Sequence, residues 1–153
     1  MKVGTLCFLI RGDNILLAMK KRGFGMGKWN GVGGKVNPDE KIEAAALREL
    51  EEEIGVIGKE RDLESVGVLK FRSENKELDW DSHIFFLRRW EGEPQESEEM
   101  EPKWHLGSQL PFGAMWPDDK YWFPYVLSGK QIEGRFQLNS EGKEVLTFEI
   151  EEI

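Results

Sequence analysis

The amino-acid sequence predicts an α+β protein, an α/β/α sandwich in which a central mixed β-sheet is flanked by helices. Two observations support this fold class. Several segments rich in β-branched and aromatic residues are separated by turn residues, and one segment between them has the apolar period of an amphipathic helix. Strands and helices mixed in this way favour helices packed on the faces of one sheet. The 153 residues suit one compact core, so we expect a single domain over residues 1–153.

The predicted strands are bounded by turn residues. Arg11–Asn14 separates the first two, and the last two form a closing hairpin. The stretch 91–102 is acidic and predicted to be irregular, and Trp104 begins a short strand or turn. A second helix is expected over 118–128 in spite of Pro124. The strand ranges that we predict are 3–10, 15–19, 65–72, 82–90, 132–138 and 144–150.

One helix is bounded at both ends by clear signals and follows a loop with six glycines in the twelve residues 23–34. The segment Asn37–Glu40 offers an N-cap asparagine, a proline suited to the first helical position and a glutamate placed for a capping box. Gly55 fits the left-handed residue that follows a last helical turn. We therefore expect a helix from about residue 39, or a little later, to residue 54.

The composition limits the partners and the location. A net charge of −8 opposes non-specific binding of DNA or RNA. No apolar run is long enough to span a membrane, and the N-terminus does not resemble a signal peptide. The lone Cys7 cannot form an intramolecular disulfide, so a reducing cytoplasm is expected. Nothing indicates an interface element, and we expect a monomer.

The charge is unevenly distributed along the chain. No acidic residue occurs from Asn14 to Pro38, and this stretch carries Lys20, Lys21, Arg22, Lys28 and Lys35. A local cationic segment in an acidic protein is what the binding of a small polyphosphate needs. A solvated basic loop is the alternative interpretation.

The predicted first helix carries Glu49, Glu52 and Glu53 at positions i, i+3 and i+4, on one face. Two unit charges about 4 Å apart repel by about 4 kcal/mol at an effective dielectric of about 20. A hard divalent cation such as Mg²⁺ or Mn²⁺ would remove this repulsion and keep positions for water and phosphate. An exposed acidic face of a solvated helix is the alternative.

The wider spacing around these glutamates is Gly34, five residues, Glu40, seven residues, Arg48-Glu49-Leu50, one residue, Glu52-Glu53, one residue, Gly55-Val56. In this the chain resembles the Nudix hydrolases, and a Nudix fold is therefore expected. The resemblance implies that Glu49, Glu52 and Glu53 bind Mg²⁺, with Mn²⁺ a substitute, and that Glu52 or Glu53 is the base. It implies that Arg48 orients a glutamate, that Glu40 is structural, and that Gly33 or Gly34 lends a carbonyl to the metal.

A second group of residues is suited to reading a purine base. Asp118 and Asp119 are adjacent acids next to Trp116, and two carboxyls sharing an apolar site cannot both ionise easily. One protonated and one ionised carboxyl could donate to and accept from a purine edge, and could read two different edges by exchanging the proton. Helix-start acids that meet the helix dipole are the alternative. Asn30 offers an amide donor and acceptor, and Trp116 and Phe24 could stack on a base.

The segments 20–31 and 116–124, together with the spacing above, resemble the eukaryotic-type MutT branch of the family, which hydrolyses oxidised purine nucleoside triphosphates. That branch implies hydrolysis of 8-oxo-dGTP and 2-hydroxy-dATP to the monophosphate and pyrophosphate, which sanitises the nucleotide pool. It implies a fourth metal-binding glutamate at Glu99, with Glu98 next best. Trp80 matches the pocket less closely and leaves base preference open. The substrate-binding residues expected are Thr5, Lys20, Phe24, Asn30, Gly33, Gly34, Lys35, Phe71, Trp116, Asp118 and Asp119.

Two other functions stay open at this point. One is a Nudix hydrolase of another substrate, such as a diadenosine polyphosphate, ADP-ribose or a methylated purine triphosphate. The other is a catalytically silent nucleotide-binding module. The intact set Glu49, Glu52 and Glu53 argues against the silent module, and the Asp118–Asp119 pair favours oxidised purines. The ranking of substrates, the sugar preference and the metal count do not follow from the sequence.

Overall fold

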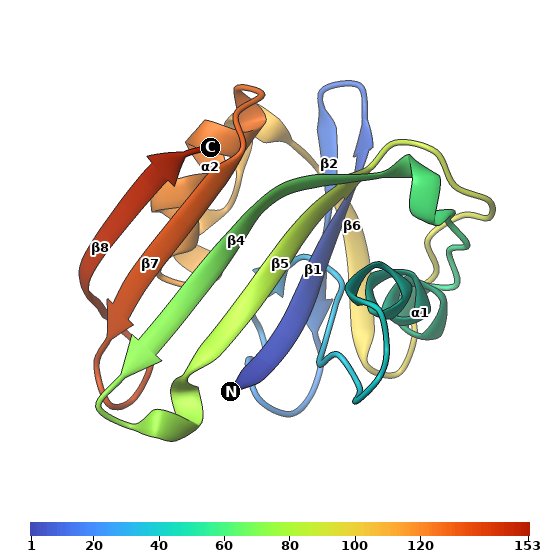
Figure 1. Ribbon diagram of the computed structural model, residues 1–153. Coiled ribbons are helices and arrows are strands. Elements are labelled where there is room, and N and C mark those ends of the chain that lie inside the picture. The colour runs from blue at the N-terminus through green and yellow to red at the C-terminus, as the bar shows by residue number, and fades with distance from the viewer.

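The computed structural model describes residues 1–153 and has the predicted helix-flanked mixed sheet (Figure 1). The α-helices are α1 (Ile42–Ile54) and α2 (Asp119–Leu127). The strands are β1 (Lys2–Arg11), β2 (Asn14–Lys20), β3 (Trp29–Asn30), β4 (Leu63–Ser73), β5 (Trp80–Leu87), β6 (Met100–Leu106), β7 (Ile132–Leu138) and β8 (Val145–Glu152). Neither helix is long and apolar enough to cross a membrane.

The sheet combines parallel and antiparallel pairs in the order β3-β2-β1-β5-β4-β7-β8, with β6 also paired to β2. β1 runs parallel to β5, and β4 runs parallel to β7. β1 and β2 pair only beside their hairpin, at Ile10–Ile15 and Arg11–Asn14. The two strands therefore separate toward the start of β1, where the glycine-containing segment 31–36 bridges to β1 instead.

The two faces of β1 pack on different helices. Cys7 and Leu9 belong to the apolar cluster that contains Leu50 and Ile54 of α1. Phe8 and Ile10 belong to the cluster that contains the α2 residues Trp122, Phe123 and Val126. Because side chains alternate between the faces of a strand, α1 and α2 cover opposite sides of the sheet.

The helix α1 begins a little later than residue 39, within the predicted range, but Asn37 does not cap it as predicted. Asp39 has a φ of 66°, and the Glu40 N–H donates to the Asn37 carbonyl at 3.1 Å, so the segment 37–40 is a turn. The Glu40 carboxylate does accept from the Asn37 N–H at 3.0 Å, but the helix begins only at Ile42. A turn and a helix start can use the same local hydrogen bonds. The bonds between Asn37 and Glu40, which were predicted to cap the helix, instead close the turn that precedes it. Gly55 ends α1 with a φ of 73°, as predicted.

β6 is a full strand where an irregular stretch followed by a short strand or turn was predicted. It pairs with β2 along its whole length, from Lys20–Met100 to Asn14–Leu106. Pro102 is tolerated inside it because β6 pairs with β2 alone, so its other edge needs no N–H donor. β5 ends at Leu87 rather than at residue 90. The α2 helix and the β7–β8 hairpin match their predicted positions closely.

Candidate active site

The inner face of α1 brings Glu49 and Glu53 together. The Glu49 side chain is only 12% exposed, and Glu53 Oε2 is buried with no hydrogen-bond partner. Burial, followed by the negative charge of Glu49, raises the pKa of Glu53 to about 8. Glu99 raises the pKa of Glu53 further, whereas Lys20 lowers it, so both lie near this carboxyl. Glu49 and Glu53 thus place two carboxyl groups side by side, and the nearby positive charge of Lys20 does not offset their repulsion.

Glu52 points away from this pair and toward Arg48. Its carboxylate accepts from Arg48 Nη1 at 3.3 Å and is 59% exposed. Arg48 binds Glu40 with two nitrogens, Nε at 2.8 Å and Nη2 at 3.1 Å, and Glu49 with Nη1 at 2.9 Å. Arg48 Nη2 also donates to the Lys35 carbonyl at 3.1 Å. The Arg48 contacts lower the pKa of Glu40. Arg48 therefore ties α1 to the turn before it.

Replacing Arg48 with methionine should lower the free energy of unfolding by about 2 kcal/mol, because charge-assisted hydrogen bonds to two half-buried carboxylates are lost. Chemical denaturation with a matched Arg61→Met control tests this, since Arg61 is exposed and Met adds the same side chain there. Equal stability of the two variants would show that the Arg48 network does not hold the turn onto α1.

The oxygens on this face fit a hard divalent cation. Gly34 lies so close to Glu49 that a Cβ on it would be 2.7 Å from Glu49 Oε1, so a backbone segment approaches the carboxylates here. Glu53 Oε2 has no hydrogen-bond partner. The pKa of Glu53 is raised because burial and the neighbouring carboxylates outweigh the nearby positive charge of Lys20. In the structure no three carboxylate side chains converge on one point, because the Glu52 carboxylate is hydrogen-bonded to Arg48. The carboxylate oxygens nevertheless match the ligands that Mg²⁺ and Mn²⁺ prefer.

The acidic loop before β6 is clamped against the end of β2. The Lys21 N–H donates to the Glu99 carbonyl at 2.8 Å, and Lys21 Nζ donates to the Ser97 carbonyl at 2.8 Å and pairs with Glu96. Arg22 lies 3.4 Å from the Glu99 carboxylate. Glu99 is thus held near the α1 carboxylates, while Glu98 is 89% exposed. The sequence showed both the basic and the acidic segment, but not that Lys21 and Arg22 would fix this loop.

Asp118 and Asp119 are both buried, at 6% and 2% exposure. Asp118 Oδ2 accepts from Trp122 Nε1 at 2.9 Å, and Asp119 Oδ2 has no partner. Burial raises the pKa of both, and the charge of Asp118 helps to raise the pKa of Asp119 well above its usual value. Asp118 is the N-cap residue of α2 but makes no side-chain cap bond. The Asp118 side chain therefore does not cap α2, and its carboxylate bonds the Trp122 indole instead.

Aromatic side chains stand beside the aspartates. The Phe24 ring lies 5.3 Å from that of Trp116, and 72% of Phe24 is exposed. Gly25 adopts a φ of 85° against Trp116, which allows the loop to place Phe24 there. Asn30 accepts from the Gly31 N–H at 2.8 Å, and its amide N–H₂ donates to no residue. Phe24 and Trp116 thus present two neighbouring rings, and Asn30 presents an amide N–H₂ that makes no hydrogen bond within the protein.

Thr5 of β1 lies against the glycine-containing segment beside the α1 carboxylates. Its N–H donates to the Gly34 carbonyl at 2.9 Å, and its buried Oγ1 has no partner. Gly33 packs so tightly on β1 that a Cβ would lie 1.7 Å from the Thr5 carbonyl oxygen. Phe71 is half-buried and stacks on Phe136 with 5.6 Å between ring centres. Lys35 is exposed.

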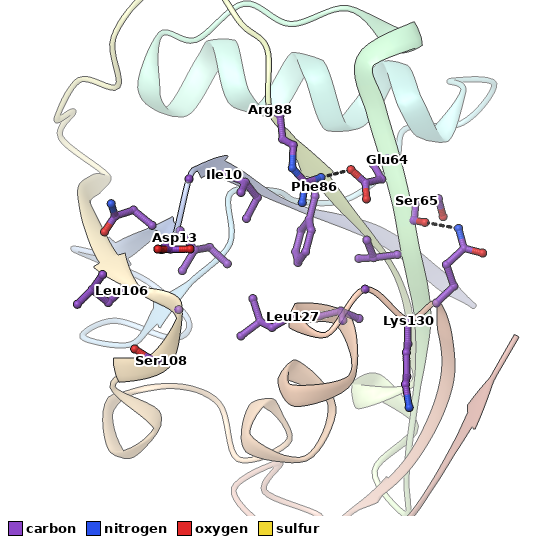
Figure 2. Close-up of a pocket in the computed structure, with 18 of the residues that line it drawn as sticks. Ile10, Asp13, Glu64, Ser65, Phe86, Arg88, Leu106, Ser108, Leu127 and Lys130 are labelled. Atoms are coloured by element: carbon purple, nitrogen blue, oxygen red, sulfur yellow. Dashed lines mark hydrogen bonds and ion pairs between the residues drawn. The ribbon is translucent and has the colours of Figure 1, made fainter.

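A cavity of about 810 Å³ lies elsewhere (Figure 2). Ile10, Phe86 and Leu127 line it at the end of the sheet away from the aspartates. Four of its five charged side chains are paired, Arg88 with Glu64 and Lys130 with Glu152, and only Asp13 makes no ion pair. None of the predicted site residues lines this cavity. The predicted site residues are thus grouped around α1 and the start of α2, apart from this cavity.

Comparison with known proteins places this site in a family. A model of the NUDIX domain matches residues 1–126. The chain is 42% identical over 149 residues to the oxidized purine nucleoside triphosphate hydrolase of Mus musculus, covering 97% of this chain and 94% of that protein. It is 45% identical over 145 residues to the protein of the same name in Danio rerio, covering 95% and 90%.

A solved structure agrees over the whole length. The MutT protein from Bacillus halodurans superposes with a TM-score of 0.85 at 26% identity, covering 99% of this chain and 98% of that one. The match includes the sheet and both helices that carry the carboxylates and the aspartate pair. From the matching domain model and the two relatives, this chain belongs to the Nudix hydrolase family.

Proposed function

We propose that this enzyme hydrolyses oxidised purine nucleoside triphosphates, among them 8-oxo-dGTP and 2-hydroxy-dATP, to the monophosphate and pyrophosphate. The observation that carries the proposal is the buried Asp118–Asp119 pair beside Trp116, with one carboxyl oxygen unpartnered. Two relatives of 42% and 45% identity carry the name oxidized purine nucleoside triphosphate hydrolase, which supports it. The activity would remove oxidised bases from the nucleotide pool.

Nudix hydrolases generally use divalent metal ions. We propose Mg²⁺ for this chain, with Mn²⁺ as a substitute, held by carboxylates of Glu49, Glu52, Glu53 and Glu99 and by the Gly33 carbonyl. Glu52 would have to leave Arg48 to join them. When bound, the metal ion supplies positive charge to the attacked phosphate and lowers the pKa of bound water.

The chain's own residues would divide the remaining work. Glu53 Oε2, unpartnered and with its pKa raised to about 8, is suited to take a proton from the attacking water, and Glu52 is the alternative base. Arg48 orients Glu49 through its 2.9 Å hydrogen bond. Lys20 and Lys35 offer positive charge to the phosphates.

The base would lie at the other half of the site. Phe24 and Trp116 offer their rings, and Asn30 offers its free amide N–H₂. A protonated Asp119 beside an acceptor Asp118 can donate to and accept from a purine edge. Phe71, Thr5 and the Gly34 backbone complete the set of residues that we assign to the substrate.

We further propose one catalytic domain over residues 1–153 that acts as a monomer in the cytoplasm, without nucleic acid or membrane as a partner. The net charge of −8 supports the absence of nucleic acid, since a polyanion would be repelled. Cys7 is buried and free, and burial raises the pKa of its thiol to about 12, which suits a reduced structural residue.

A pyrophosphate-release assay with Mg²⁺ tests this function. We expect kcat/KM on 8-oxo-dGTP and 2-hydroxy-dATP at least about tenfold above that on dGTP, because the aspartate pair should read the altered edge. O6-methyl-dGTP, ADP-ribose and diadenosine tetraphosphate complete the panel. Activity confined to ADP-ribose or the dinucleotide would overturn the assignment of the base pocket. Nucleotide binding with no turnover of any substrate would indicate a silent module.

A further inference from the structure

Three arginines meet at one edge of the sheet. β1 and β5 run parallel and side by side, with Leu9 opposite Leu87, so their carboxyl ends lie at the same edge (Figure 1). Arg11 is the last residue of β1, and Arg88 and Arg89 directly follow the last residue of β5. The parallel register therefore brings together cations from two distant segments of the chain.

These arginines line a hollow of about 680 Å³, which we call the arginine hollow. Its other lining residues are Ile10, Gly12, Trp90, Gly92 and Glu93. Three cations thus face a single acidic side chain, in a protein whose net charge is −8. The hollow adjoins the cavity of Figure 2, with which it shares Ile10, Gly12 and Arg88. None of the residues that we assign to the Nudix site lines it.

Aromatic rings lie next to two of the three guanidinium groups. Arg11 Cζ is 4.7 Å from the centre of the Trp104 ring and 5.2 Å from that of Trp90, and the two indoles stack with 6.1 Å between centres. Arg88 Cζ is 5.9 Å from the centre of the Phe86 ring. A cation already held over an aromatic ring loses less side-chain freedom when a ligand binds, so these two arginines are pre-organised.

Most N–H groups of these arginines have no partner in the protein. Arg11 Nη2 lies 3.6 Å from Glu93 Oε2, too far for a hydrogen bond, and both side chains are more than half exposed. Arg89 is exposed and makes neither a hydrogen bond nor an ion pair. Only Arg88 has a close partner, because its Nη1 donates to Glu64, which lies outside the lining of the hollow. Two guanidinium groups therefore keep their donors for a ligand.

A small anion with several charges matches this arrangement. Arginine forks bind phosphate oxygens through parallel, charge-assisted hydrogen bonds. A concave hollow of several hundred Å³ suits a small molecule better than an extended acidic chain. The Trp90 ring already has Arg11 and Trp104 as neighbours, so recognition would depend on charge rather than on the stacking of a base.

We propose that the arginine hollow binds a small polyphosphate anion, of which pyrophosphate is the simplest, and that Arg11 and Arg89 are its principal ligands. Arg88 adds positive charge from the wall that borders the neighbouring cavity. The site is separate from the carboxylates of α1, and it does not depend on the proposed function, although that function would release pyrophosphate.

Calorimetric titration of pyrophosphate into the protein in a chelator tests the site, since the α1 carboxylates should repel this anion when no metal ion is present. Arg11→Gln and Arg89→Gln should each weaken binding about tenfold, as the loss of charge-assisted hydrogen bonds predicts. Arg61→Gln is the matched control, because Arg61 is also exposed but lies outside the hollow. Absence of binding by the wild type, or equal weakening in the control, overturns the proposal.

Removal of the acid from the hollow should have the opposite effect. Glu93→Gln should strengthen the binding of pyrophosphate about two- to fivefold, because a weak surface ion pair no longer competes for Arg11. Glu98→Gln is the control, since Glu98 is also exposed and also lies 3.6 Å from an arginine, Arg22, outside the hollow. Stronger binding by Glu98→Gln and not by Glu93→Gln would place the anion at the cationic segment 20–35 and overturn the proposal.

Spectra of the ¹⁵N-labelled protein show where the anion binds. Pyrophosphate should shift the indole N–H signals of Trp90 and Trp104, which lie next to Arg11, and leave that of Trp116 in place. Lys28 Nζ lies 5.5 Å from the centre of the Trp116 ring, so a shift of Trp116 alone would again indicate the cationic segment and overturn the proposal. Tighter binding of a hexaglutamate peptide than of pyrophosphate would assign the hollow to an acidic protein segment instead.

Discussion

Replacing Glu53 with glutamine should lower kcat at least about a hundredfold, because it removes both a metal-binding carboxylate and the candidate base. Glutamine has nearly the same shape, so the α1 face should stay packed. Steady-state kinetics on 8-oxo-dGTP with saturating Mg²⁺ measures the effect. Glu51→Gln is the control, since Glu51 is exposed on the same helix and makes no ion pair. Near-normal turnover of Glu53→Gln would exclude both roles for this residue.

The same variant should be more stable than the wild type at alkaline pH when no metal is present. The pKa of Glu53 is raised from 4.5 to about 8 by burial and by Glu49 and Glu99, against the opposing charge of Lys20. The folded state thus holds a proton that the unfolded chain releases above about pH 4.5, and stability falls as the pH rises through this window to about 8. After solvent screening we expect about 2 kcal/mol.

Denaturation of both proteins in a chelator at pH 5 and pH 9 measures this difference. Glu53→Gln should match the wild type at pH 5 and exceed it at pH 9. Added Mg²⁺ should reverse the order at pH 9, since the ion should bind and stabilise the protein that keeps this carboxylate more strongly than the variant that lacks it. If the difference in unfolding free energy between Glu53→Gln and the wild type is the same at pH 5 and pH 9, the pKa of Glu53 is not raised by its surroundings.

The approach of Glu49 and Glu53 on one face of α1 was predictable from the sequence, because it depends only on the helical period. Glu49 and Glu53 are four residues apart on an amphipathic helix, and the structure brings them together as the spacing requires. The direction of Glu52 was not predictable. It depends on Arg48, whose guanidinium is fixed by two bonds to Glu40 in a turn that the local signals assigned to the helix.

Long-range pairing explains the other differences. β6 contains Pro102 between the charged Glu101 and Lys103, so its own residues do not predict a strand, and its partners in β2 lie 80 to 92 residues earlier. The same register places Trp80 on Gly4, a contact that neither segment announces alone. The prediction that Asp118 and Asp119 share a raised pKa required both side chains to be buried in an apolar site. They are buried in the structure because α2 packs against β1, which neither segment indicates by itself.

Replacing Asp119 with asparagine should lower kcat/KM on oxidised purines about a hundredfold while leaving the melting temperature close to that of the wild type. A site built from paired hydrogen bonds rejects a ligand strongly when one buried group can no longer switch between donor and acceptor. Burial and the charge of Asp118 keep the pKa of Asp119 well above its usual value, which favours the neutral acid, and the neutral amide of asparagine has nearly the same shape, so packing should change little. Asp13→Asn, at an exposed turn, is the control.

The two oxidised substrates should separate in this variant. An asparagine presents a fixed donor and a fixed acceptor, whereas the acid pair can place its proton on either carboxyl. The activity of Asp119→Asn should therefore fall unequally on 8-oxo-dGTP and 2-hydroxy-dATP, because their edges carry donors and acceptors in different order. If Asp119→Asn instead acts equally on both and on dGTP, at wild-type rates, the aspartates serve only to begin α2. The burial of Asp119 would then need another structural cause. The hydrogen bond from Trp122 accounts for the burial of Asp118 but not for that of Asp119, whose Oδ2 has no partner.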